Sequence, residues 1–262
     1  MKIALVGAGN VASSLGVLLA DAGYTIASVF SRTIENAAVL AEKVGAVAVD
    51  SLSEIPQSDV YLVMLSDDAL LGLAPDIVRS CPDAVFVHTS GSVPMSVWTD
   101  AGAGRCGVFY PMQSFTKGKI PERDRLPLFL EASDSATMAL LHAMASAIST
   151  SVTEFDSCQR GRLHLAAVFA TNFANRMMTI SEHILKDVGL PFDIMAPLLK
   201  EMVDKALVLS PGRSQTGPAA RGDRRVMDMH EELLATKPEW LELYRLISAD
   251  ILKGRNDYDN KR

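Results

Sequence analysis

Residues 1–12 of the chain are MKIALVGAGNVA, an apolar run that leads into a Gly-x-Gly-x-x-Ala turn. Residues 3–6 have the composition of a buried strand, and apolar residues at helical spacing follow the turn. Gly7 would permit a tight turn, Gly9 would let backbone N–H groups approach a pyrophosphate, and Ala12 is small enough for a helix to pack closely on the strand. The stretch therefore predicts a strand-turn-helix unit that binds a dinucleotide, with the pyrophosphate at the helix N-terminus. The residues expected to contact it are Gly7, Gly9, Asn10 and Val11.

The end of the second predicted strand indicates which dinucleotide is bound. Residues 26–30 form this strand, and Ser31 and Arg32 follow it. Sites for NAD usually carry Asp or Glu here, because a carboxylate accepts hydrogen bonds from the ribose 2′-OH and repels a 2′-phosphate. A hydroxyl followed by a guanidinium suits that phosphate instead. We therefore predict NADP(H) as the cofactor; the alternative is that Arg32 is a solvated loop residue.

Composition limits the classes of protein to which the chain can belong. Its length of 262 residues predicts two domains, and 48% hydrophobic with 21% charged residues is typical of a globular protein. No apolar run approaches membrane-spanning length, and a net charge of −6 without a long basic run argues against nucleic acid as a partner. A strand that begins at Lys2 leaves no room for a signal peptide, so we expect a cytoplasmic protein. Cys81, Cys106 and Cys158 lack metal-type spacing, which predicts free thiols and no metal site.

The pattern of elements changes near Asp156. Before it, eight predicted strands alternate with helices, at residues 3–6, 26–30, 46–49, 60–65, 84–88, 107–110, 128–131 and 151–155. After it, only helices are predicted, at residues 159–186, 193–209, 223–236 and 240–252, with a frayed tail from Lys253. We predict an α/β fold in which residues 1–156 form a doubly wound, mostly parallel Rossmann sheet and residues 157–262 form an all-helical domain.

Ligands of open α/β sheets bind beyond the carboxyl ends of the strands, where three polar segments lie in this chain. The first follows residue 65 and begins with Ser66, a predicted cofactor neighbour, although such a residue more often caps the next helix. Thr89 and Ser90 lie in the second, where we expect nicotinamide and substrate to meet; turn chemistry alone could also explain them. The third comprises residues 110–115.

The predicted helix at residues 159–186 carries an unusual polar stripe. From residue 163 to residue 181 its only charged residue is Arg176, so we expect this part to be largely buried. Five neutral hydrogen-bonding residues fall within about a 100° arc of it: His164, Thr171, Asn172, Asn175 and Thr179. They could satisfy one another, but the stripe would border an interdomain cleft, where pockets are common. We therefore predict functional roles for His164 and Asn172.

A loop rich in Gly and Pro, residues 210–223, interrupts the helical region. Its Thr-Gly-Pro entry and Gly exit would fix the direction of Arg221, whose guanidinium could bind a carboxylate or phosphate with two hydrogen bonds. Asp223 is the expected N-cap of the following helix.

Six stretches together carry a resemblance to a known family, at residues 7–12, 66–68, 88–91, 111–115, 163–172 and 216–223. Over nearly its full length the chain resembles Rossmann-like NADP oxidoreductases with a C-terminal helical domain of unassigned function. They belong to the 6-phosphogluconate dehydrogenase-like superfamily and are related to pyrroline-5-carboxylate reductase and 3-hydroxyisobutyrate dehydrogenase. The resemblance implies an NADP-binding domain, a helical domain that often mediates homodimers, and an active site between the two.

The chain departs from this superfamily at the position of the catalytic base. The hydroxyacid dehydrogenases place a Lys in the first long interdomain helix, whereas the predicted helix here has no Lys before Lys186. His164 is the expected substitute, since histidine can donate and accept a proton near neutral pH. Tyr110 stands where relatives often have His.

Two functions are compatible with these patterns. The first is an NADP-dependent oxidoreductase that moves a hydride between nicotinamide and a carbonyl or imine carbon of a small polar metabolite. In it His164 would protonate the substrate, Asn172 and Ser90 would orient it, and Arg221 would bind an anionic group. The second is a non-catalytic NADP(H)-binding sensor, which the fold alone does not exclude. The polar stripe favours the enzyme, because a sensor needs no further hydrogen-bonding pocket.

Overall fold

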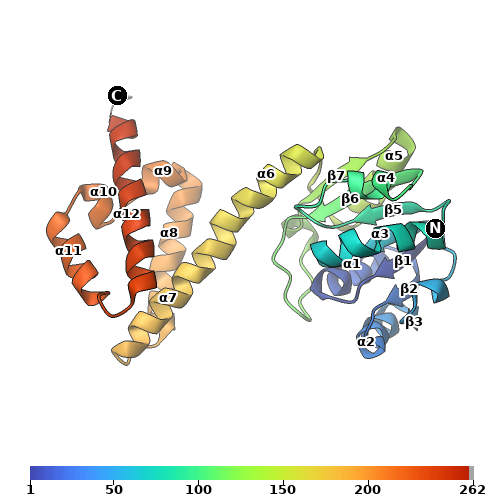
Figure 1. Cartoon of the computed structure of the whole chain (residues 1–262), viewed down its shortest axis with the longest axis horizontal. Helices are drawn as coiled ribbons and strands as arrows, with labels where there is room; N and C mark the ends of the chain where they lie inside the picture. The colour runs from blue at the N-terminus through green and yellow to red at the C-terminus, as the bar shows by residue number, and fades with distance from the viewer. Residues whose placement is uncertain (260–262) are drawn as a thin grey trace. The chain divides into compact units, whose positions relative to one another are not determined.

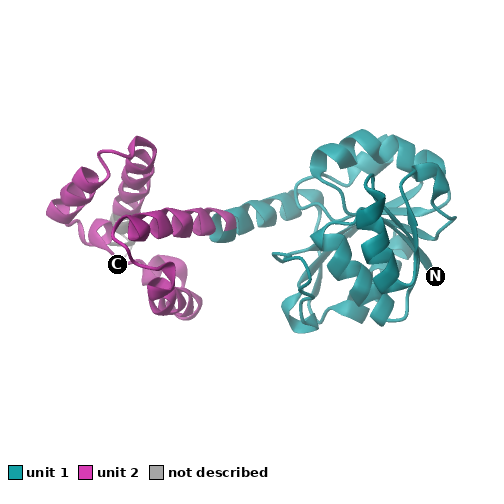
Figure 2. Ribbon diagram, turned by 90° about the horizontal axis from the view of Figure 1, so that it is seen from below, with its two compact units in different colours: residues 1–171 teal, residues 172–262 magenta. Residues whose placement is uncertain are grey.

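The computed structural model describes residues 1–259 and the side chains of residues 1–254 (Figure 1). The chain forms two compact units, residues 1–171 and 172–262, which Figure 2 distinguishes by colour. The predicted domain boundary at Asp156 stays a prediction.

The first unit is built on a sheet that has eight strands in the described part of the chain. They are β1 (Lys2–Val6), β2 (Thr25–Phe30), β3 (Val47–Val49), β4 (Val60–Val63), β5 (Val85–His88), β6 (Arg105–Pro111), β7 (Leu128–Ala132) and β8 (Val152–Glu154). Their order is β3-β2-β1-β4-β5-β6-β7-β8, and all pairs are parallel except β6 with β7. Each predicted strand is present with small shifts at its ends, so the predicted α/β class is confirmed.

Helices and short turns connect the strands. They are α1 (Asn10–Asp21), α2 (Ile34–Val44), η1 (Leu52–Glu54), α3 (Asp67–Ser80), α4 (Ser96–Asp100), η2 (Arg123–Arg125) and α5 (Ser135–Ile148). The end of α2 follows from one residue, because Gly45 adopts the left-handed conformation with φ +66° and stops the helix.

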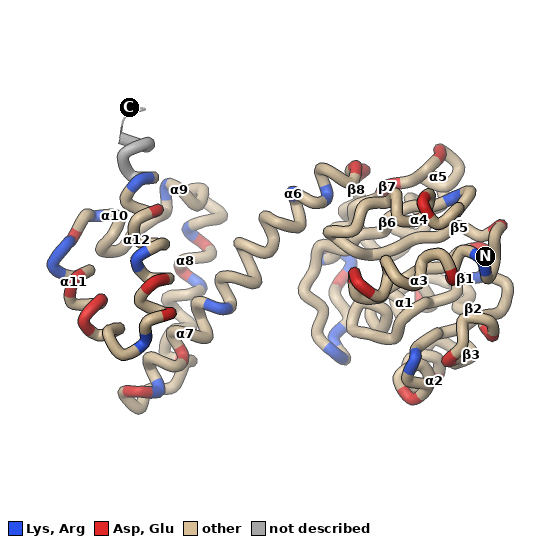
Figure 3. Tube along the Cα trace, in the orientation of Figure 1, with Lys and Arg blue, Asp and Glu red and all other residues tan. Residues whose placement is uncertain are grey.

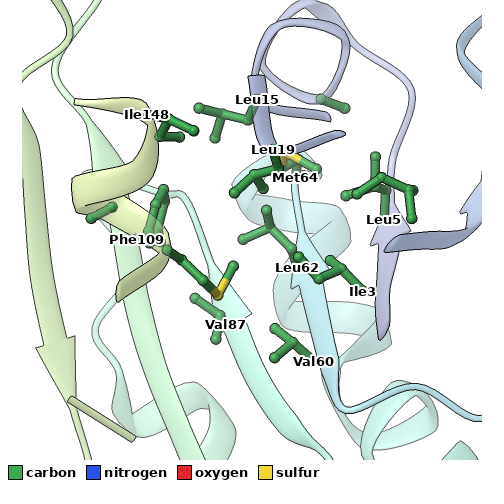
Figure 4. Close-up of a cluster of buried hydrophobic side chains, with 14 of the residues drawn as sticks. Ile3, Leu5, Leu15, Leu19, Val60, Leu62, Met64, Val87, Phe109 and Ile148 are labelled. Carbon is green, nitrogen blue, oxygen red and sulfur yellow. The ribbon is translucent and has the colours of Figure 1, made fainter. Parts of the chain in front are cut away.

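Both faces of the sheet are buried. Ile3 and Leu5 of β1 pack on one face in a cluster with α1, α2 and α5, and Ala4 and Val6 pack on the other with α3 and α4. Figure 4 shows members of the first cluster from strands and helices facing one another. The continuous apolar strands are explained by this burial on both sides. Strands β1 to β6 all run in the same direction, so their carboxyl ends lie at one edge of the sheet. This edge carries the candidate site.

Helices make up the rest of the chain. They are α6 (Ser157–Ala167), the π-helical segment η3 (Val168–Phe173), α7 (Ala174–Asp187), η4 (Phe192–Met195), α8 (Ala196–Leu209), α9 (Pro211–Ser214), α10 (Pro218–Arg221), α11 (Arg224–Leu233) and α12 (Pro238–Asp259). The helix predicted at residues 159–186 is present, but a π-helical segment divides it. Pro197 lies in the first turn of α8, where proline is tolerated, and does not interrupt the helix. The predicted tail from Lys253 is helical to Asp259, and residues 260–262 lie outside the described residues.

One expectation about the long helix is wrong. No side chain between residues 163 and 181 is buried, and Leu165, Phe169 and Phe173 are 57%, 64% and 49% exposed. The middle of this helical run carries little charge, as predicted (Figure 3). A run with little charge can be buried only where another element covers it, so low charge alone did not predict the exposure.

Among the described helices, none combines the length and hydropathy needed to cross a lipid bilayer. No group of three or more His, Cys, Asp or Glu in the described part of the chain could hold a metal ion. Cys81 and Cys106 are buried, Cys158 is exposed, and all three are free thiols.

Candidate cofactor site and active site

Gly7 is required by the backbone of the turn after β1. Its φ is +122°, a conformation that residues with a side chain rarely adopt, and an added Cβ would lie 2.4 Å from the carbonyl oxygen of Met64. Its N–H donates a 2.9 Å hydrogen bond to the carbonyl of Phe30, at the end of β2. The turn is therefore held between β2 and the end of β4.

Gly9 is in a different situation, because no protein atom would touch an added Cβ within 4 Å. Gly9 is the N-cap of α1 and offers no side-chain cap, so the first N–H groups of the helix have no acceptor within it. A cavity of about 180 Å³ lies beside this turn. It is lined by Gly7, Ala8, Gly9, Phe30, Ser31, Arg32, Met64, Leu65, Ser66, Ala69 and Leu73. Unpaired N–H groups beside open space fit the pyrophosphate of a dinucleotide.

Ser31 and Arg32 line the same cavity. The Ser31 hydroxyl accepts a 3.3 Å hydrogen bond from the N–H of Thr33. The Arg32 side chain is exposed and has no hydrogen bond or ion pair to any described residue. Its guanidinium is therefore available to a phosphate on the adenosine ribose, and this arrangement fits NADP(H).

The other predicted cofactor residues are also located at this edge. The amide of Asn10 donates to the carbonyl of Phe115 at 3.2 Å, which ties the loop after β6 to the start of α1, and Val11 packs against the core. Ser66 is the N-cap residue of α3, but its hydroxyl makes no capping hydrogen bond and is left for another partner. Thr89 is half-buried, and its N–H donates to the carbonyl of Val63. Contacts of these residues with the cofactor stay predictions.

The Ser90 hydroxyl is part of a hydrogen-bond network within its loop. It donates to Oδ1 of Asp67 at 2.7 Å and accepts from the N–H groups of Ser92 at 3.2 Å and Val93 at 3.0 Å. The Ser92 hydroxyl donates to the other carboxylate oxygen of Asp67. These contacts favour the turn alternative for Ser90, whose predicted role in orienting substrate stays a prediction. Asp67 belongs to the segment of residues 66–68 that carries the family resemblance, but no role in this loop was predicted for it.

His88 holds the same loop from the side of the core. Its side chain is buried, and Nδ1 accepts a 3.2 Å hydrogen bond from the N–H of Ser90. Burial, followed by the positive charge of Arg160, lowers the pKa of His88 to about 3. The ring is therefore neutral at physiological pH and acts as a hydrogen-bond acceptor.

His164 of α6 lies against the loop after β5 and the end of β6. Its Nδ1 is 3.1 Å from the hydroxyl of Tyr110, and the two rings meet edge to face. Burial raises the pKa of the Tyr110 phenol, whereas Arg160 acts in the opposite direction. The phenol is thus protonated and can donate to Nδ1 when that nitrogen carries no proton.

Gly91 makes this pair possible. A Cβ at Gly91 would lie 2.5 Å from Nδ1 of His164 and 2.9 Å from Cε2 of Tyr110. Only a residue without a side chain lets the loop and the helix approach so closely. The loop that contains the predicted residue Ser90 therefore lies against the helix that carries His164. Gly91 and Tyr110 are the residues at this contact.

The remaining predicted residues belong to the second unit. Asn172 is exposed and lies in η3. Arg221 ends α10 between Gly217 and Gly222, which both have positive φ, and its side chain has no hydrogen bond or ion pair to any described residue. Asp223 accepts from the N–H of Val226 at 3.3 Å, so the predicted N-cap is confirmed. The roles of Asn172 and Arg221 toward the substrate stay predictions.

Comparisons with known proteins identify the family of the chain. Residues 2–90 match the family described as NADP oxidoreductase, coenzyme F420-dependent, and residues 126–251 match the domain of unknown function DUF2520. Among solved structures, the putative NADP oxidoreductase of Bacteroides fragilis is 42% identical, with 96% of this chain and 98% of that chain covered and a TM-score of 0.90. The chain belongs to this NADP oxidoreductase family. The predicted resemblance and the predicted cofactor NADP are thereby confirmed.

Two further solved structures are similar to this chain. A protein of Thermotoga maritima is 25% identical, with 98% of this chain and 99% of that chain covered and a TM-score of 0.73. The imine reductase of Myxococcus stipitatus, in complex with NADP+, is 17% identical, with 99% and 95% covered and a TM-score of 0.66, and supports the fold alone. No curated protein matches the chain.

Proposed function

We propose that this NADP oxidoreductase reduces the carbonyl or imine carbon of a small polar metabolite, or oxidises the corresponding alcohol or amine, with His164 as the proton donor or acceptor. One observation carries the proposal: His164 is hydrogen-bonded to Tyr110 and lies against Gly91, beyond the carboxyl ends of β5 and β6. In open α/β sheets this is the edge where ligands bind. Ser31, Arg32 and the turn at Gly9 would hold the nucleotide at the same edge.

When bound, NADPH supplies a hydride, which is two electrons and a proton, to the substrate carbon. The substrate heteroatom then needs one proton, and His164 in its doubly protonated form would deliver it from Nε2, which leaves a neutral imidazole. Tyr110 would keep the ring in the orientation that this requires, through the hydrogen bond between its hydroxyl and Nδ1. The predicted roles of Asn172 in orienting the substrate and of Arg221 in binding an anionic group are further parts of the proposal.

Turnover assays with a panel of oxo acids, hydroxy acids and imines test the proposal. We expect NADP(H)-dependent turnover with at least one compound class. Tight NADP(H) binding without turnover of any compound would instead support the non-catalytic sensor.

Replacing Arg32 with alanine tests cofactor selection. A charge-assisted hydrogen bond to a phosphate contributes about 1.5–3 kcal/mol, so KM for NADPH should rise by about 10- to 100-fold. KM for NADH should stay within twofold, because NADH lacks the 2′-phosphate. Lys43→Ala is the matched control, because it removes an exposed positive charge from the following helix, α2. Equal losses for both cofactors would contradict the assignment.

We also propose that the protein is a homodimer whose interface includes the second unit. Among the described residues of this unit, only Ala219 and Met227 are buried hydrophobic residues. Its exposed large apolar side chains include Ile184, Val188, Ile194, Leu198, Leu207, Val208 and Leu233. This core is small for a helical unit of this size, and a second copy would cover the exposed apolar surface.

Light scattering coupled to size exclusion tests the homodimer. We expect a mass near twice 28.2 kDa for the wild type. Leu207, which is 80% exposed on α8, should be part of the interface, so Leu207→Asp should weaken dimerisation by about ten- to hundredfold. Lys200→Ala changes the charge of α8 equally without removing apolar surface and should leave the mass unchanged. A stable, monodisperse wild-type monomer would overturn the proposal.

A further inference from the structure

Arg160 is the most completely buried charged residue among those described, and the mechanism above assigns it no part. It lies in the second turn of α6 with 1% of its surface exposed. The guanidinium forms an ion pair with Glu131 of β7 and donates to the carbonyl of Val93 at 2.7 Å and to the Ser157 hydroxyl at 3.2 Å. A buried arginine with three different partners joins three segments of the fold.

One of these segments is the loop that contains Ser90. Both backbone polar groups of Val93 are hydrogen-bonded to side chains. The Arg160 guanidinium donates to the Val93 carbonyl, and the Val93 N–H donates to the Ser90 hydroxyl at 3.0 Å. Two residues further on, the N–H of Met95 donates to the Ser157 hydroxyl at 3.0 Å. The loop is thus attached to the start of α6 at Val93 and Met95.

The second segment is the helix that carries His164. Arg160 and His164 are four residues apart, so they lie on the same face of α6. The first turn of α6 is fixed by a capping box between Asp156 and Gln159 and by the Ser157 hydroxyl on Glu131. One turn later, the helix touches the loop at Gly91, where not even a methyl group would fit beside His164.

We propose that Arg160 is a positioning residue that holds the loop of residues 90–95 against α6 and thereby keeps His164 on Tyr110. The proposal rests on the proposed role of His164. Arginine suits this task because its planar group donates several hydrogen bonds in fixed directions, whereas lysine offers a single ammonium group. Arg160 does not touch the reacting atoms, and its effect reaches them through the loop and the helix.

A paired substitution separates positioning from stability. Arg160→Met alone would leave the Glu131 carboxylate without its partner and could unfold the protein. The double variant R160M/E131M removes both charges, and a buried ion pair replaced by apolar groups is often tolerated. We expect its melting temperature and its KM for NADPH to stay close to those of the wild type, while kcat falls at least tenfold.

Two single variants complete the series. Arg160→Lys can still pair with Glu131 but cannot also reach Val93, so kcat should lie between those of the wild type and the double variant. Arg162→Met, an exposed position two residues along the same helix, should behave like the wild type. An R160M/E131M variant with wild-type kcat would overturn the proposal.

A spectroscopic measurement tests the proposal without any substrate. The ¹⁵N chemical shift of His164 Nδ1 reports its hydrogen bond with Tyr110. The Tyr110→Phe variant lacks the hydroxyl and provides the reference shift without this hydrogen bond. We expect R160M/E131M to shift this resonance toward that of Tyr110→Phe, and Arg162→Met to leave it unchanged. An unshifted resonance in folded R160M/E131M would refute the positioning role. If no compound is turned over, the proposed function fails, and this measurement still decides the role of Arg160.

Discussion

Replacing His164 with alanine should lower kcat by about 10²- to 10⁴-fold, the range typical of losing a general acid or base. The dissociation constant for NADPH should stay within about threefold, because general acid–base catalysis acts on the reaction step and not on cofactor binding. Steady-state kinetics together with a fluorescence titration of NADPH measures both quantities. Normal turnover by the variant would remove His164 from the mechanism.

Two further variants make this result specific. His142→Ala removes another histidine of the first unit, which pairs with Glu154 at the surface, and should leave kcat unchanged. Tyr110→Phe keeps the ring but removes the hydroxyl that bonds His164, so kcat should fall by about tenfold. A larger loss of kcat for Tyr110→Phe than for His164→Ala would indicate that Tyr110, and not His164, is the proton donor or acceptor.

The two glycines of the first turn should respond differently to alanine. Gly7→Ala places a Cβ against the carbonyl of Met64 in a backbone conformation with φ +122°, and we expect a loss of about 3 kcal/mol or more in the free energy of unfolding. Gly9→Ala meets no protein atom and should leave the free energy of unfolding within about 0.5 kcal/mol.

Binding of NADPH should show the complementary result for Gly9. Its added methyl group would stand in the space beside the N-terminus of α1, where the pyrophosphate is expected, and should weaken binding by about ten- to hundredfold. Chemical denaturation measures stability, and NADPH fluorescence measures binding. A Gly9→Ala variant that is destabilised but binds NADPH normally would show that Gly9 serves the fold and not the cofactor.

Local chemistry explains why so much of the first unit could be predicted. An apolar run buried on both faces is recognisable as a strand wherever it occurs, and Gly45 or Asp223 ends or begins a helix through its own backbone or side chain. The turn at Gly7 likewise needs only neighbouring residues to be recognised. Such features depend on a few consecutive positions, so the order of strands and helices follows from the sequence.

Burial of the long helix could not be predicted in the same way. Residues 163–181 include one charged residue, which indicates that burial of this part of the helix would be favourable. The pattern does not indicate which element would cover it. Leu165 and Phe169 are more than half exposed, and the elements that could cover a helix are distant in the sequence, where periodicity does not identify them.

The sequence by itself determined the strand-turn-helix unit, and it predicted a dinucleotide site at Gly9 and Arg32 and His164 as a candidate. Tertiary structure alone decided the partners of these residues. Tyr110 and His164 are 54 positions apart, Ser90 and Asp67 are 23 apart, and Glu131 and Arg160 are 29 apart. No helical or strand periodicity relates such positions, because they meet only when β4, β5, β6 and β7 align in one sheet and α6 begins beside them.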